Sequence, residues 1–223
     1  MLLRSRRAWH LSRRMAHHGR VLSPFFQTES AGPADVIRLI SHDKTNRPTR
    51  ACVQALTAAI EQMKRQNELR PLILAGNSQF FSVGADLNEI NALTGPEAYE
   101  FSAIGQRLMR TIETYRAPVI AAVEGHCMGG GLDLALACHR RISCAISIFG
   151  HRGAALGLMT GWGGTQRLPR LIGRARALEL FIAAEKISAA RALEIGLVEA
   201  VVERPVEEAI RSLQAAASIS ALV

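Results

Sequence analysis

Two glycine-rich turns could each present unpaired backbone N–H groups to a ligand. The first is Ser82-Val83-Gly84-Ala85-Asp86, and the second covers residues 125–131. Each follows an apolar run and precedes a helical pattern, and the first N–H groups of a helix have no partner inside the helix. Glycine also lets a ligand approach the backbone closely. If both turns face one point, their N–H groups would form an oxyanion hole, which stabilises negative charge developing on a carbonyl oxygen.

Few titratable side chains stand near these turns. Asp133 follows the second turn, and residues 134–178 contain no Asp or Glu. Asp133 is therefore the first candidate for a catalytic acid or base, although the helix macrodipole alone also favours a carboxylate at this place. His151 is the second candidate, because the usual pKa of a histidine, about 6.5, suits proton transfer; a partly exposed loop histidine is the alternative. Arg152 could meet a carboxylate on a substrate, or face solvent.

The elements that must position these residues alternate between short apolar strands and amphipathic helices, a pattern typical of an α/β fold. Asp86 and Glu89 stand at the spacing of a capping box, which marks a helix start after the first turn. We expect strands at 36–40, 72–75, 80–81, 118–124, around 142–149 and at 197–202, and helices at 49–66, 96–115, 132–137, 165–172, 175–184, 189–195 and from about 205 onwards.

Composition predicts a single domain with one substantial core. The chain has 223 residues, of which 48% are hydrophobic and 21% charged, enough to bury such a core. Its apolar stretches are far shorter than the ~20 residues of a membrane span. The four cysteines show no zinc-site spacing, which favours free thiols and no metal. No phosphate loop, metalloprotease helix or GxSxG nucleophile turn is present in the sequence.

The net charge of +8 is concentrated at the N-terminus. Residues 1–28 contain six arginines and no acid, which leaves 21 basic against 19 acidic residues elsewhere. Such a balance argues against nucleic-acid binding. We expect 1–28 to be a disordered or targeting-like extension and 29–223 to be the domain. The extension resembles a mitochondrial transit peptide, but arginine is frequent along the whole chain. We therefore expect a cytoplasmic protein, with the mitochondrial matrix as the alternative.

Four segments together resemble the enoyl-CoA hydratase/isomerase (crotonase) family in order and spacing. They are FSVGADL at 81–87, PVIAAVEG at 118–125, GGGLDLA at 129–135 and GGTQRL at 163–168. The resemblance implies a spiral of ββα units, an acyl-CoA thioester as substrate with coenzyme A as part of it and no further cofactor, and a homotrimer or hexamer. It also implies that Ala85 and Gly130 donate the two oxyanion-hole N–H groups. The implied thioester pocket consists of Val83, Gly84, Ala85, Asp86, Leu87, Cys127, Gly129 and Gly130.

The sequence departs from the family pattern in two places. The resemblance implies that hydratases of this family use two glutamates. Asp133 stands at the position of the first glutamate, and Gly153, which has no carboxylate, stands at the position of the second. The chain also ends at Val223, before the closing helices that the family resemblance implies, so we expect those helices to be truncated and the trimer contacts and pocket closure to be affected.

These observations predict an acyl-CoA enzyme that stabilises a thioester enolate and is hydratase-like. Hydration needs one group to activate water and one to deliver the α-proton. The first alternative is an enoyl-CoA isomerase or acyl-CoA decarboxylase. In a decarboxylase, loss of CO₂ generates the carbanion, so stabilisation by the oxyanion hole would provide most of the catalysis. The second is a non-catalytic acyl-CoA-binding member of the family.

Overall fold

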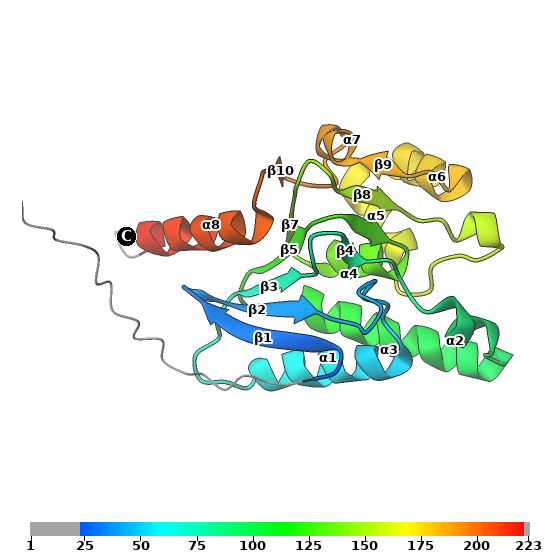
Figure 1. Cartoon of the computed structure of the whole chain (residues 1–223), viewed down its shortest axis with the longest axis horizontal. Helices are drawn as coiled ribbons and strands as arrows, with labels where there is room; N and C mark the ends of the chain where they lie inside the picture. The colour runs from blue at the N-terminus through cyan, green and yellow to red at the C-terminus, as the bar shows by residue number, and fades with distance from the viewer. Residues whose placement is uncertain (1–22, 221–223) are drawn as a thin grey trace, which may run out of the picture.

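Two mostly parallel β-sheets form the centre of the fold in the computed structural model, which describes residues 23–220 (Figure 1). A six-stranded sheet has the order β1-β2-β3-β5-β7-β10, and a four-stranded sheet has the order β4-β6-β8-β9. The strands are β1 Phe26–Ala31, β2 Ala34–Leu39, β3 Leu72–Ala75, β4 Phe80–Ser82, β5 Val119–Val123, β6 His126–Met128, β7 Arg140–Ser143, β8 Ile148–Gly150, β9 Ile187–Ser188 and β10 Ala200–Val201.

Consecutive strands divide between the two sheets. β3, β5 and β7 enter the larger sheet, and the strand after each one, β4, β6 or β8, enters the smaller sheet. One or two helices follow each pair, so the chain advances as a spiral of ββα units. The predicted α/β fold is confirmed. The helices are α1 Arg50–Met63, α2 Leu87–Asn91, α3 Gly95–Glu113, α4 Gly130–Ala137, α5 Gly164–Ile172, α6 Arg174–Ala183, α7 Ala189–Glu194 and α8 Pro205–Ser220, with a 3₁₀ turn at Ala154–Leu156.

Helices cover the larger sheet on both faces. All residues of β3 and β5 are buried, as expected for parallel strands whose two faces are both covered. One face joins the main core with α1, α3 and α4. On the other face, Ala209 and Leu213 of α8 pack against strand residues such as Ile73 and Ile120. In Figure 1, α8 lies well apart from α1 and α3.

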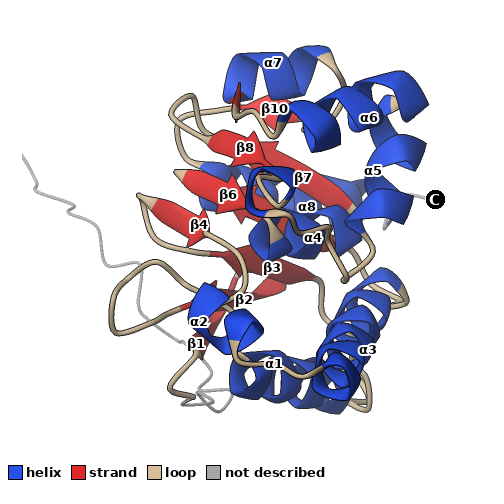
Figure 2. Cartoon of the chain, turned by 90° about the vertical axis from the view of Figure 1, so that its right-hand side faces the viewer, coloured by secondary structure: helices blue, strands red, loops and turns tan. Residues whose placement is uncertain are grey.

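Side-chain caps begin two of the helices beside the sheets. Thr49 accepts a hydrogen bond from Cys52 N at the start of α1, and Thr94 forms a capping box with Glu97 at the start of α3. Such caps satisfy backbone N–H groups that the helix itself leaves unpaired. α1 and α3 pack against each other (Figure 2), and together they support one side of the site described below.

The predicted N-terminal boundary at residue 28 is wrong. β1 already begins at Phe26, which is buried and pairs with Leu39 of β2. The sequence analysis missed this strand, as well as β6 and β9. The remainder of the predicted extension, residues 1–22, lies outside the described residues, so its targeting role stays a prediction.

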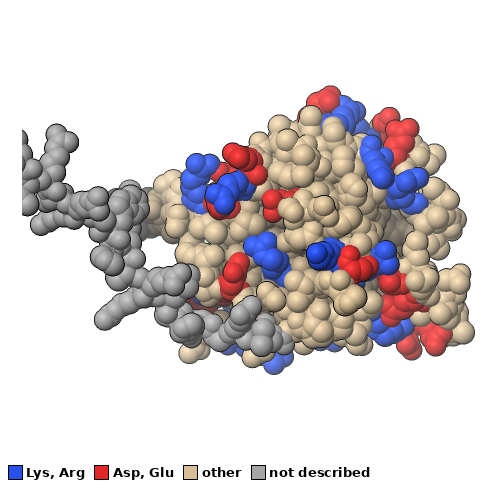
Figure 3. Space-filling model, in the orientation of Figure 1, with Lys and Arg blue, Asp and Glu red and all other residues tan. Residues whose placement is uncertain are grey.

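Two further features of the described residues concern helix hydrophobicity and surface charge. No helix within residues 23–220 is long and apolar enough to cross a membrane. On the face drawn in Figure 3, acidic and basic side chains are interspersed, and neither sign forms a continuous patch on that face.

Candidate active site

Three neighbouring parallel strands of the smaller sheet end at one edge (Figure 2). β6 pairs with β4 on one side, Ser82 opposite Cys127, and with β8 on the other side, Met128 opposite Gly150. The two glycine turns follow β4 and β6, and His151 follows β8 directly. In parallel α/β sheets, ligands bind at the carboxyl ends of the strands. The topology therefore brings together three segments that are distant in the sequence.

The two glycine turns are in van der Waals contact. A Cβ placed on Gly84 would lie 3.0 Å from Gly130 N, and one placed on Gly130 would lie 3.4 Å from Ala85 N. Gly84 and Gly129 have φ angles of 92° and 51°, in a region that side chains other than glycine rarely adopt. Within residues 23–220, neither the Ala85 N–H nor the Gly130 N–H donates a hydrogen bond. Two unpaired backbone donors thus lie side by side.

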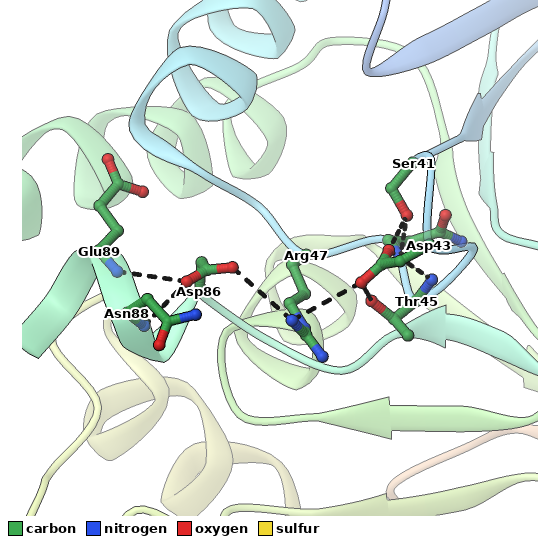
Figure 4. Close-up of polar contacts among 8 residues, drawn as sticks. Ser41, Asp43, Thr45, Arg47, Asp86, Asn88 and Glu89 are labelled. Atoms are coloured by element: carbon green, nitrogen blue, oxygen red, sulfur yellow. Dashed lines mark hydrogen bonds and ion pairs between the residues drawn. The ribbon is translucent and has the colours of Figure 1, made fainter.

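An ionic bridge connects the Ala85 turn to the loop before α1 (Figure 4). An Arg47 nitrogen lies 3.6 Å from an Asp43 carboxylate oxygen and 3.7 Å from an Asp86 carboxylate oxygen. Asp86 in turn accepts hydrogen bonds from Asn88 N and Glu89 N, which caps α2. The residue directly after Ala85 is therefore fixed from two sides.

Asp43 organises the loop on the other side of this bridge (Figure 4). Its carboxylate accepts hydrogen bonds from the Ser41 hydroxyl at 2.7 Å and from the Thr45 hydroxyl at 2.7 Å. The hydrogen bond from Ser41, followed by that from Thr45, lowers the pKa of Asp43 to about 2. Thr45 O also accepts a hydrogen bond from Val83 N, so this loop contacts the first glycine turn directly.

A cavity of about 330 Å³ opens beside the two amides. It is bounded by the first glycine turn, α2, α3, the second glycine turn and the segment 151–162. Six of the eight predicted pocket residues line it: Val83, Gly84, Ala85, Leu87, Gly129 and Gly130. The sequence analysis missed most of its apolar wall, namely Ile90, Leu93, Ala98, Phe101, Met128, Leu156, Leu158 and Met159.

Two predicted pocket residues lie elsewhere. The Asp86 side chain caps α2 and faces Arg47. Cys127 is fully buried in the middle of β6, where its Sγ lies 3.6 Å from Gly131 O. Trp162, which was not among the predicted pocket residues, closes one wall: it packs against Phe101 and donates a hydrogen bond to the carbonyl oxygen of that residue.

Asp133 and His151 meet in the wall of this cavity. Asp133 Oδ1 lies 3.1 Å from His151 Nε2, although these atoms lack the alignment of a hydrogen bond. The Thr160 hydroxyl donates a hydrogen bond to the other oxygen, Asp133 Oδ2. Both Asp133 and His151 are buried, at 2% and 4% exposure. The alternative prediction, that His151 is a partly exposed loop histidine, is therefore wrong.

Among residues 23–220, Asp133 is the only acidic residue that lines the cavity, and His151 and Arg152 are the basic ones. Gly153, at the position of the missing carboxylate, also lines it; a Cβ there would lie 2.7 Å from Leu158 O. Arg152 is exposed and takes part in none of the ion pairs of the described chain. Within the same residues, no group of three or more His, Cys, Asp or Glu side chains could hold a metal ion.

The spiral of ββα units around this cavity defines a protein of the crotonase fold. Residues 33–221 match the sequence profile of the enoyl-CoA hydratase/isomerase family, and the chain belongs to that family.

Individual relatives agree with this assignment. A probable enoyl-CoA hydratase of Bacillus subtilis (strain 168) is 43% identical over 147 residues, which are 66% of this chain and 57% of that protein. The match thus spans less than two thirds of that relative. The structure of enoyl-CoA hydratase from Bacillus anthracis is 34% identical, with a TM-score of 0.80, covering 87% of this chain and 76% of its own. That of enoyl-CoA hydratase from Thermoplasma volcanium GSS1 is 30% identical, with a TM-score of 0.79, covering 83% of this chain and 75% of its own.

Proposed function

We propose that this protein binds an acyl-CoA thioester and stabilises its enolate between the N–H groups of Ala85 and Gly130. The observation that carries the proposal is the pair of adjacent, unpaired backbone donors beside the cavity. When a thioester becomes an enolate, negative charge develops on the carbonyl oxygen, and fixed donors about 2.7–3.1 Å away stabilise it without reorganising. The backbone of both turns is held in place by other parts of the fold before substrate binds.

The reaction that we propose first is hydratase-like. Water adds to a double bond conjugated with the thioester: its oxygen bonds to the β-carbon, and a proton reaches the α-carbon. We assign the transfer of that proton to the Asp133 and His151 pair, since no other acid in the part of the chain that the structure describes lines the cavity. Coenzyme A enters as part of the substrate. Relatives that are named enoyl-CoA hydratases support this choice of reaction.

Hydration of crotonyl-CoA by the purified protein tests the proposal. We expect turnover by the wild type and a loss of about 100-fold or more in Asp133→Asn, because acid–base groups contribute rate factors of this size. Glu68→Gln, at an exposed position outside the cavity, is the control and should retain activity. No hydration by the wild type would count against this reaction.

A second candidate reaction is decarboxylation. Two observations on residues 23–220 favour it: Arg152 at the cavity has no ion-pair partner, and Asp133 is the one carboxylate that lines the cavity. An arginine can bind a carboxylate of the substrate, and loss of CO₂ generates the enolate without a base. Isomerisation of an enoyl-CoA likewise needs only one proton carrier. A panel of malonyl-type, 2-enoyl and 3-enoyl thioesters separates the three reactions; turnover of 2-enoyl substrates alone excludes decarboxylation.

The remaining candidate is a non-catalytic acyl-CoA-binding protein, which the absence of a carboxylate at Gly153 favours. It predicts that acyl-CoA binds but that no thioester of the panel reacts. Calorimetry with acetyl-CoA tests binding separately from turnover, and a protein that binds no acyl-CoA contradicts the whole proposal.

A further inference from the structure

We infer that His151, rather than Asp133, exchanges the proton with the substrate, and that Asp133 positions the His151 ring. This inference rests on the proposed function, and it divides the work within the Asp133 and His151 pair. Neither the four segments that resemble the family nor the relatives' names assign such a histidine.

The carboxylate of Asp133 faces protein groups on both of its oxygens. Oδ2 accepts the hydrogen bond from the Thr160 hydroxyl, and Oδ1 lies 3.1 Å from His151 Nε2. Oδ1 is fully buried, and the whole residue is only 2% exposed. Asp133 also lines the cavity, but both of its oxygens face protein groups, and we infer that this carboxylate orients the histidine rather than reaching a substrate carbon.

The two ring nitrogens of His151 have different surroundings. Nε2 is buried and faces Asp133. No hydrogen bond of the described chain involves Nδ1, and Nδ1 keeps some accessible surface, so we infer that it is the nitrogen directed to the cavity that His151 lines. The Phe181 ring packs against the imidazole with centroids 5.3 Å apart. A base oriented by a third group is the usual arrangement for activating a reacting molecule.

Gly164 supplies the space that the pair needs. A Cβ at this position would lie 2.2 Å from Asp133 Oδ1 and 2.9 Å from His151 Nε2. Any side chain would therefore force the two groups apart. The 3.1 Å separation without hydrogen-bond alignment is also common before substrate binds, since catalytic hydrogen bonds often tighten in the complex.

In the proposed reaction, His151 Nδ1 both accepts the proton and returns it. As the water oxygen bonds to the β-carbon, Nδ1 takes a proton from that water, and the double-bond electrons move onto the thioester oxygen. The resulting enolate lies between the Ala85 and Gly130 N–H groups. When it collapses, the imidazolium returns the proton to the α-carbon, and the ring is neutral again. Asp133 remains ionised and stabilises the imidazolium, so no second carboxylate is needed.

Chemical rescue tests the assignment with crotonyl-CoA as substrate. His151→Ala should lower kcat by about 100-fold or more while changing the affinity for acetyl-CoA little. Added imidazole should restore part of kcat, and a series of substituted imidazoles should restore it in order of basicity, because proton-transfer rates follow the strength of the base. His42→Gln, an exposed histidine outside the cavity, is the matched control and should keep wild-type kcat.

The double variant His151→Ala/Asp133→Asn separates the two roles. If His151 carries the proton, added imidazole still restores some activity there, since a free base needs no positioning carboxylate. Rescue of the single variant but not of the double variant overturns the assignment and returns the proton to Asp133. Full activity in His151→Ala overturns it as well, as does a wild type that binds acetyl-CoA but turns over none of the panel. A wild type that binds no acyl-CoA instead removes the proposed function itself.

Discussion

Gly130 is the residue at which an added methyl group would act most directly on the proposed thioester site. A Cβ there would lie 2.6 Å from the Trp162 ring and 3.4 Å from Ala85 N. It would clash with the Trp162 ring, so Trp162 or the second glycine turn, which carries the Gly130 N–H, would have to shift. We expect Gly130→Ala to lower kcat by about 100-fold, the size of effect seen when one oxyanion-hole donor is lost.

Steady-state kinetics with crotonyl-CoA measures this effect. The control is Gly95→Ala, because a Cβ at Gly95 meets no atom within 4 Å and alanine is a better helix former than glycine. Gly95→Ala should keep its activity. Equal losses of kcat in the two glycine variants would mean that the loss does not depend on crowding at Gly130. The assignment of the Gly130 N–H as a donor would then lose this support.

Burial also determines the reactivity of the thiols. It raises the pKa of Cys52 and of Cys138 to about 12 and that of Cys127 well above its usual range. The thiolate is the reactive form, and it is scarce at pH 8 when the pKa is raised. We expect these three cysteines to resist alkylation by iodoacetamide at pH 8 in the folded protein and to react in denaturant. Mass spectrometry of the labelled peptides measures this, and rapid labelling of Cys127 in the folded protein would contradict it.

The candidate site could be predicted in part from individual residues. The two glycine turns, Asp133 and His151 were identifiable because turn glycines and isolated titratable groups leave clear signals in a sequence, whereas Ala85 and Gly130 were assigned as donors through the family resemblance. Cys127 was misassigned because alternate residues of a strand face opposite sides, and its neighbours in a short strand did not indicate which side faces the cavity.

One further prediction at the residue scale was confirmed, and one contact could not be predicted. Asp86 stood at capping-box spacing, and the structure confirms that it caps α2, although it does not line the pocket. The contact of Thr160 with Asp133 spans 27 residues, a separation over which no local pattern carries information.

At the scale of single elements, α2 depends on one cap. α2 contains five residues and none of them is buried, so packing contributes little to it. We expect Asp86→Ala to destabilise the protein by about 1 kcal/mol, as for other N-cap replacements by alanine, and to reduce turnover because Ala85 precedes the cap. Asp86→Asn keeps a side-chain acceptor and should be nearly as stable as the wild type. Urea unfolding and crotonyl-CoA kinetics measure the two effects, and equal stability of the Ala and Asn variants would exclude the capping role.

The loop 41–47 should make stability depend on pH. Its Asp43 has a folded-state pKa lowered from 3.8 to about 2, so the carboxylate stabilises the fold above about pH 4, and this contribution is lost as the pH falls from about 4 towards 2. Because Asp43 is exposed, solvent screening limits the effect to about 1 kcal/mol at most.

Urea titrations of Asp43→Asn at pH 7, 5 and 3.5 test this expectation. The variant should be less stable than the wild type at pH 7 and 5, and the difference should shrink at pH 3.5. Glu68→Gln, an exposed carboxylate on another loop, is the control and should show a smaller difference at each pH. A gap between Asp43→Asn and the wild type that widens towards acid would contradict the lowered pKa.

Elements with strong local patterns could be predicted from the sequence, and those without them could not. β3 and β5 are continuous apolar runs, which are typical of strands buried on both faces, and both were placed within a residue of their bounds. β1 has the sequence FQTESA, in which polar residues obscure the alternation. β6 lies within a glycine-rich run, and β9 contains only two residues.

At the scale of the whole molecule, apolar side chains remain on the surface of the chain. Leu178 and Ile182 of α6 are 58% and 69% exposed, and Leu156 and Met159 of the cavity loop are exposed as well. Exposed apolar groups of this kind mark interaction surfaces when they gather together. The family resemblance implies a homotrimer or hexamer, and we expect α6 to contribute to the contact between subunits.

Sedimentation equilibrium at micromolar concentration tests this expectation. The wild type should have the mass of three or six chains, and the double variant Leu178→Glu/Ile182→Glu should dissociate, since charges on a buried contact are costly. Tyr99→Glu, at an exposed position on α3, is the control and should retain the oligomer. A monomeric wild type would contradict the predicted assembly.

The division of strands between two sheets could not be predicted from patterns along the chain. Pairing of β4 with β6 and of β6 with β8 joins segments separated by helices and further strands, and hydrophobic periodicity reports only the faces of one element at a time. The resemblance to a family supplied the spiral, and the structure confirms it.

The three neighbouring strand ends divide the proposed substrate binding from the proposed catalysis. Backbone amides after β4 and β6 would bind the thioester carbonyl oxygen whatever side chains surround them. The group after β8, in contrast, is the side chain of His151, which a substitution replaces. We expect a replacement of this side chain to keep the backbone hydrogen bond from Gly129 N to Gly150 O, and with it the geometry of the other two strand ends. We therefore expect that substitutions after β8 can change the reaction while thioester binding is retained. The same fold could in this way serve several reactions of acyl-CoA thioesters.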